Sequence, residues 1–173
     1  MSTATDLLHA YLEDAIAAEK NFETQLRTFA KEGADSVAIG LFTQHADETR
    51  IQYDRLQARL NLLGGSTSGL KTVLAQMLGM LPNIGKVGHH MEERTVQNLI
   101  VAYTVECAET AMYEALAIVA KQAGDTVTEQ LARDIQQEER TTADKIWAHL
   151  PTATRTSFNR IVGTDAPTYR RAS

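Results

Sequence analysis

The feature of this sequence that most limits its fold is a set of four apolar stripes with the spacing of an α-helix. In the first, apolar positions recur in steps of four and three between Leu8 and Phe29, which places them on one helical face. Similar stripes run through 41–63, 99–120 and 131–146. The 173 residues contain only 10 Gly and 3 Pro, so we predict helices joined by turns.

Turn and capping residues separate the four predicted helices. The second helix is predicted to begin near Asp35 or Ser36, both good N-cap types, and the fourth with Thr126 and Glu129, which are spaced as a capping box. The predicted stops are Gly33, Gly64 with Gly65, Gly124 and Pro151. Short turns then make the first and second helices one antiparallel hairpin, and the third and fourth another.

A long segment, residues 66–91, joins the two hairpins and carries an apolar stretch at 70–81 that predicts a short extra helix. Such a segment can run the length of a bundle, so the predicted architecture is an all-α four-helix bundle with one long crossover. An alternative is that the short helix lies on a membrane surface or binds a partner. We expect residues 1–151 to form the bundle and residues 152–173 a short C-terminal tail.

The two predicted hairpins resemble each other at a constant offset of 90 positions. Glu19 corresponds to Glu109, and Glu48 to Glu138. The matches also include Leu26 with Leu116, Asp35 with Asp125, Val37 with Val127 and Leu41 with Leu131. Packing about a pseudo-twofold axis would bring the four glutamates to one level. The alternative is chance similarity between amphipathic helices rich in Ala, Leu and Glu.

Ionisable side chains interrupt the apolar stripes. They are Glu19, His45, Glu48, Glu106, Glu109 and Glu138, and Glu139 flanks the last stripe on its other side. An unpaired buried carboxylate costs several kcal/mol or becomes protonated, and the stripes contain no Lys or Arg to pair with. Two divalent cations would balance four carboxylates, and carboxylate and imidazole ligands suit iron, manganese and zinc. These residues therefore predict a two-metal site.

Each of these residues also has a simpler interpretation. A helical glutamate usually lies on a solvated surface, and either Glu138 or Glu139 suits the fourth helix. His45 could be a core histidine hydrogen-bonded to a neighbour, and Glu106 an acceptor outside the ligand set. Tyr113, one turn beyond Glu109, packs in the core or hydrogen-bonds that carboxylate. The other four histidines have no stripe carboxylate at ligand spacing, so we expect them on the surface or in loops.

Charge and cysteine content exclude several classes of protein. A formal net charge of -5 offers nothing that attracts a nucleic-acid backbone. The single cysteine, Cys107, cannot form an internal disulfide and is typical of a reducing compartment. The first residues lack the pattern of a signal peptide, and no apolar run is long enough to cross a bilayer. We therefore expect a cytoplasmic protein without a membrane span.

Four short motifs carry a resemblance to a known family. They are Asp14-x-x-x-Ala18-Glu19-Lys20, Phe42-x-x-His45-x-x-Glu48-Thr49, Glu106-x-x-Glu109-x-x-x-Tyr113 and Glu138-Glu139-x-x-Thr142. In this order they resemble the YciE/YciF-like family of bacterial ferritin-like proteins, over residues 7–150. The resemblance implies a ferritin-like bundle, a homodimer, a stress-associated role and a two-metal centre. From the ligand types we expect iron or manganese there, with zinc able to substitute in vitro. The resemblance also implies ligands at Glu19, His45, Glu48, Glu106, Glu109 and either Glu138 or Glu139.

The sequence also departs from related patterns. Ala143 stands where the family has Asp, and Asp144 follows one place late. The Glu-x-x-His pairs of better-known di-iron proteins are absent, because Ile51 and Thr141 stand at the histidine positions. We hypothesise a di-metal carboxylate protein that binds metal and reacts with peroxide or oxygen. The alternatives are a non-enzymatic bundle with a vestigial site that acts through protein or surface interaction, and an oxygenase with an organic substrate.

Overall fold

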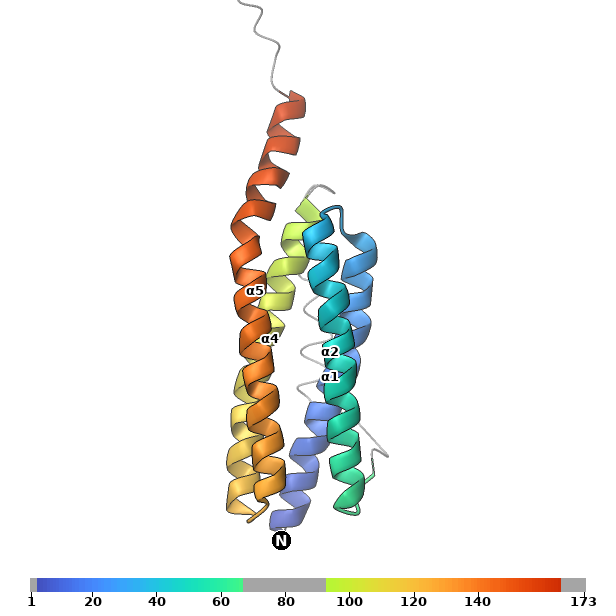
Figure 1. Cartoon of the computed structure of the whole chain (residues 1–173), viewed down its shortest axis with the longest axis vertical. Helices are drawn as coiled ribbons and strands as arrows, with labels where there is room; N and C mark the ends of the chain where they lie inside the picture. The colour runs from blue at the N-terminus through green and yellow to red at the C-terminus, as the bar shows by residue number, and fades with distance from the viewer. Residues whose placement is uncertain (1–2, 67–92, 166–173) are drawn as a thin grey trace, which may run out of the picture.

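The four long helices predicted from the apolar stripes are all present. The structure is a computed structural model and describes residues 3–66 and 93–165. Its helices are α1 (Ala4–Glu32), α2 (Ser36–Leu62), α4 (Arg94–Gln122) and α5 (Thr126–Asp165), and the described residues contain no strand. Figure 1 shows the α1–α2 hairpin packed alongside the α4–α5 hairpin in one elongated bundle. The short helix predicted within 66–91 falls outside the described residues.

The described helices begin and end at residues that satisfy their free backbone groups. Thr3 and Asp6 form a capping box at the start of α1, and the Asp35 carboxylate accepts from the first amides of α2. The predicted capping box of Thr126 and Glu129 is wrong. Asp125 caps α5 instead, since its carboxylate accepts from the backbone amide of Thr128 at 3.0 Å.

The predicted stop at Pro151 is also wrong, because α5 continues through this proline to Asp165. Residues 152–165 of the predicted tail are therefore helical. A proline inside a helix removes one backbone hydrogen bond and is tolerated where other contacts offset the loss. Ala153 and Ser157 are 4% and 5% exposed, so the buried stripe of α5 continues past the proline with small residues. The end of α5 extends beyond the other helices (Figure 1).

Apolar side chains from all four helices fill the core. Leu12, Leu26, Leu56 and Leu116 are fully buried, and the rings of Phe29 and Phe42 lie 5.5 Å apart. Burying one such side chain contributes about 1.5–3 kcal/mol. This apolar packing fixes the helices that carry the ionisable residues. None of the described helices is long and apolar enough to span a membrane.

The structure confirms the internal repeat. The buried positions of α2 (38, 42, 45, 46, 49 and 52) recur on α5 at an offset of 90 (128, 132, 135, 136, 139 and 142). The N-cap aspartates are held in equivalent ways. Asp35 lies 2.6 Å from His149 Nε2 on α5, and Asp125 lies 2.7 Å from a guanidinium nitrogen of Arg59 on α2. Position 59 corresponds to position 149, so the two hairpins are related by a pseudo-twofold axis.

Candidate metal centre

Five of the seven predicted ligands come together at the middle of the bundle. Each is at most 2% exposed, and they are Glu19 on α1, His45 on α2, Glu106 and Glu109 on α4, and Glu139 on α5. We refer to these five residues as the core cluster. Helical spacing places Glu106 and Glu109 on one face of α4, so both reach the same interior space.

The tightest part of the core cluster joins three helices. Donor atoms of His45, Glu106 and Glu139, one from each residue, all lie within 4.8 Å of one another. His45 Nε2 is 2.5 Å from Glu106 Oε1, yet neither atom has a hydrogen-bond partner of good geometry among the described residues. The two oxygens of Glu109 and of Glu139 also lack partners there. Converging donors without mutual hydrogen bonds are what a bound cation would satisfy.

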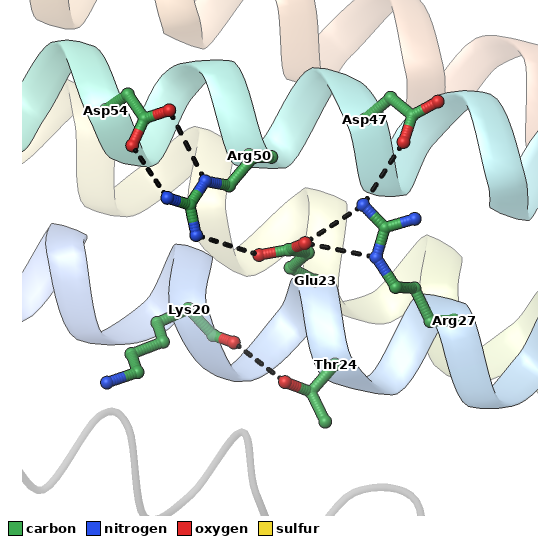
Figure 2. Close-up of polar contacts among 7 residues, drawn as sticks. All are labelled: Lys20, Glu23, Thr24, Arg27, Asp47, Arg50 and Asp54. Carbon is green, nitrogen blue, oxygen red and sulfur yellow. Dashed lines mark hydrogen bonds and ion pairs between the residues drawn. The ribbon is translucent and has the colours of Figure 1, made fainter.

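No lysine or arginine within the described ranges forms an ion pair with a carboxylate of the core cluster. Surface carboxylates of α1 and α2 are paired with arginines, as Figure 2 shows. Glu23, one turn from Glu19 on α1, lies 2.9 Å from a nitrogen of Arg27 and 3.9 Å from one of Arg50. Arg27 also reaches Asp47 across the hairpin. Among the described residues, surface carboxylates such as Glu23 and Asp47 thus pair with arginines, whereas the core-cluster carboxylates do not.

Burial controls the protonation of the core cluster. Loss of water raises the pKa of Glu19 to about 8, and it raises the pKa values of Glu109 and Glu139 well above the ordinary range. Burial alone would lower the pKa of His45, but the adjacent Glu106 carboxylate overcomes this and raises it to about 9. Without a cation, the cluster therefore retains protons near neutral pH.

Tyr113 completes the interior of the site. Its buried hydroxyl donates a hydrogen bond to Glu19 Oε1, while Glu19 Oε2 has no partner among the described residues. Burial raises the pKa of Tyr113 well above its ordinary value, so the phenol stays a donor. The spacing of the helix predicted Glu109 as the partner of any such bond. The internal repeat could have indicated Glu19 as the partner of Tyr113, because it places Glu19 opposite Glu109 across the pseudo-twofold axis.

The other two predicted ligands lie outside the core cluster. The side chain of Glu138 is 44% exposed and pairs with Arg55 at 2.7 Å. The side chain of Glu48 is 36% exposed, and its Oε2 is 3.7 Å from His45 Nδ1. The contact with His45 lowers the pKa of Glu48 to about 2. Between the two candidates on α5, the structure therefore places Glu139 in the core cluster and Glu138 at the surface.

A surface cavity of about 400 Å³ lies between α2 and α5. Its lining includes Glu48, Arg55, Glu138 and Lys145, which belong to equivalent positions of the repeat. Glu48 lines this cavity with one side and approaches the buried ring of His45 with the other. The cavity therefore reaches Glu48 but is not lined by any of the five core-cluster residues.

One histidine expected on the surface has a structural role. The side chain of His149 is 13% exposed and holds the Asp35 carboxylate at the start of α2. The offset of 90 could have indicated this contact, because His149 corresponds to Arg59, the partner of the matching aspartate.

Comparison with known proteins identifies relatives over most of the chain. The family described as "Domain of unknown function (DUF892)" matches residues 3–159. Protein YciF of Escherichia coli (strain K12) is 27% identical over 152 residues, which cover 84% of this chain and 89% of that protein. A crystal structure of a protein from Xanthomonas campestris pv. campestris is 26% identical, with a TM-score of 0.77 and coverage of 92% of this chain and 98% of that one.

Two further structures support the fold alone. The crystal structure of the E. coli stress protein YciF has a TM-score of 0.75 at 24% identity, covering 93% of this chain and 98% of that one. Dps from Staphylococcus aureus has a TM-score of 0.68 at 19% identity, covering 87% and 98%. The ferritin-like fold and the resemblance carried by the four motifs are both confirmed. The chain thus belongs to the DUF892 family, and it shares its fold with its relative YciF.

Proposed function

We propose that the protein binds two divalent metal ions, iron or manganese, in the core cluster. The observation that carries this proposal is the burial of four carboxylates and one imidazole together, with no lysine or arginine of the described residues paired to them. Four ionised carboxylates and two divalent cations have a net charge of zero. A domain with a net stability of about 5–15 kcal/mol could not bury four unpaired charges, so without metal these carboxylates must hold protons.

The donor set suits these metals. Carboxylate oxygens with one imidazole nitrogen favour iron or manganese, and they accept zinc in vitro. His45 would bind through Nε2, the atom that faces Glu106. The Glu48 carboxylate, 3.7 Å from His45 Nδ1, would act on the other side of the ring as an outer partner of this ligand. When bound, such ions supply Lewis-acid or redox chemistry toward peroxide or oxygen. Glu48 and Glu138 would then lie outside the ligand set.

The biological setting of this proposal comes from a relative. The E. coli structure is described as that of a stress protein, and peroxide and oxygen are oxidants with which a buried redox metal can react. The homodimer and the cytoplasmic location expected from the sequence stay predictions, to be tested by light scattering and by cell fractionation.

Metal analysis tests the proposal. We expect about two ions per chain after anaerobic loading with ferrous iron or with manganese, measured by mass spectrometry. Glu19→Gln/Glu109→Gln should lose most of this metal, because it removes a carboxylate from each hairpin. Glu23→Gln is the matched control, since this glutamate lies one turn away on α1 and pairs with arginines. A folded wild-type protein that takes up no metal would favour the alternative of a non-enzymatic bundle.

A further inference from the structure

The pseudo-twofold axis allows each residue of the core cluster to be compared with its counterpart. Hydrogen bonds around the site recur between positions related by the offset of 90. Gln52 donates to Glu138 at 3.1 Å, and the equivalent residue Thr142 donates to Glu48 at 3.5 Å. Together with the matching contacts of the two N-cap aspartates, these pairs establish that an offset of 90 relates equivalent places in the structure.

Only one pair in the core cluster keeps its chemistry across the axis. Glu19 corresponds to Glu109, so both halves of the site have this carboxylate. The other three residues have counterparts that are not good metal ligands. His45 corresponds to Ile135, Glu106 to Ile16, and Glu139 to Thr49.

The three unmatched residues are the ones whose donor atoms converge. His45, Glu106 and Glu139 have donor atoms within 4.8 Å of one another. Their counterparts Ile16, Thr49 and Ile135 are each 0% exposed, so they occupy equivalent core positions. The side chains of Ile16 and Ile135 are hydrocarbon, and the hydroxyl of Thr49 has no hydrogen-bond partner among the described residues. A neutral hydroxyl is a much weaker metal ligand than a carboxylate.

We propose that the two metal positions are unequal: one complete subsite, built by His45, Glu106 and Glu139, and one depleted subsite at the related place beside Thr49. This inference rests on the proposed metal-binding function and specifies how the two metal positions differ in affinity. The first ion binds tightly. The second depends on Glu19 and Glu109, which both halves share, and leaves more of its coordination positions to water or to a small oxidant.

Calorimetric titration with cobalt(II) alone, on the metal-free full chain, tests this inference. We expect two binding phases that differ at least about 10-fold in affinity, which is the effect of losing even one outer partner of a metal ligand. Glu139→Gln should abolish the tighter phase. Glu138→Gln is the control, because it changes the neighbouring carboxylate on the same helix outside the core cluster, and it should leave both phases unchanged.

A gain of function gives the sharper test. Thr49→Glu places a carboxylate at the counterpart of Glu139, so it should tighten the second phase toward the first. Thr49→Asp, with a shorter side chain, serves if Thr49→Glu does not fold by circular dichroism. Two equal phases in the wild type would overturn the inference, as would a folded carboxylate variant with an unchanged second phase. No binding of cobalt(II), iron or manganese would instead refute the proposed function itself.

Discussion

Raising the pH should destabilise the metal-free protein. Burial raises the pKa of Glu19 from its ordinary value of 4.5 to about 8, so folding favours the protonated carboxyl. Such a group stabilises the fold fully below pH 4.5 and loses this contribution as the pH rises through 8. His45, whose pKa rises from 6.5 to about 9 beside Glu106, loses its contribution in the same direction.

The magnitude follows from the size of the window. One titrating group costs about 1.4 kcal/mol per pH unit, so Glu19 alone removes roughly 4 kcal/mol between about pH 5 and about pH 8. The raised pKa values of Glu109 and Glu139 act in the same direction. Glu48 does not oppose this change: its pKa is lowered to about 2, so its contribution is already complete above 4.5.

Urea unfolding, followed by circular dichroism in the presence of a chelator, measures this effect. The free energy of unfolding should fall steadily from about pH 5 to about pH 8, and Glu19→Gln should reduce the slope by up to about 1.4 kcal/mol per pH unit. Glu23→Gln should keep the wild-type slope. Saturating manganese should reverse the trend, because metal binds deprotonated ligands. A metal-free protein whose stability is constant or rises over this range would refute buried, protonated glutamates.

Other substitutions test separate parts of the structure. Glu48→Gln should weaken cobalt(II) binding about 10-fold or more in titrations without changing stoichiometry, whereas Glu138→Gln should not; equal effects would refute the orienting contact with the histidine ring. Tyr113→Phe should lower the metal-free unfolding free energy by about 1 kcal/mol, and no change would contradict its buried hydrogen bond. Asp125→Ala should cost about 1–3 kcal/mol, because it removes an N-cap and an ion pair together. Phe42→Ala should cost about 3–5 kcal/mol in the same urea assay, and a smaller loss would mean that the core relaxes around it.

The fold was predictable because apolar spacing determines which faces of the helices must meet. Regular steps of three and four residues from Leu8 to Phe29 required a helix with one buried face, and that face is buried in the structure. The end of α5 was not predictable by the same reasoning. Ala153 and Ser157 continue its buried face with side chains too small to produce a clear apolar stripe. Pro151 was therefore predicted to end the helix, although α5 continues beyond it.

Which of the two glutamates on α5 enters the core cluster depended on a finer feature. Consecutive residues of a helix differ by about 100°, so Glu138 and Glu139 lie on opposite flanks of the line that faces the core. Periodicity alone cannot decide which flank the neighbouring helix covers. Side-chain contacts with α2 decide it, because Arg55 and Gln52 bind Glu138 at the surface while Glu139 is fully buried. Aligning Glu138 with Glu48 was correct, but the aligned pair lies outside the core cluster.

The repeat separates the requirements of folding from those of chemistry. Pairs that keep their character across the axis, such as Leu26 with Leu116, are the ones that the core needs in both halves. Pairs that differ, such as Glu139 with Thr49, change the donor set without changing burial, since both members are fully buried. Replacing a carboxylate by threonine or isoleucine removes a charge that the core must otherwise neutralise. The α4–α5 hairpin therefore buries two carboxylates, Glu106 and Glu139, at positions where the α1–α2 hairpin has Ile16 and Thr49, and these two carboxylates are part of the proposed metal site.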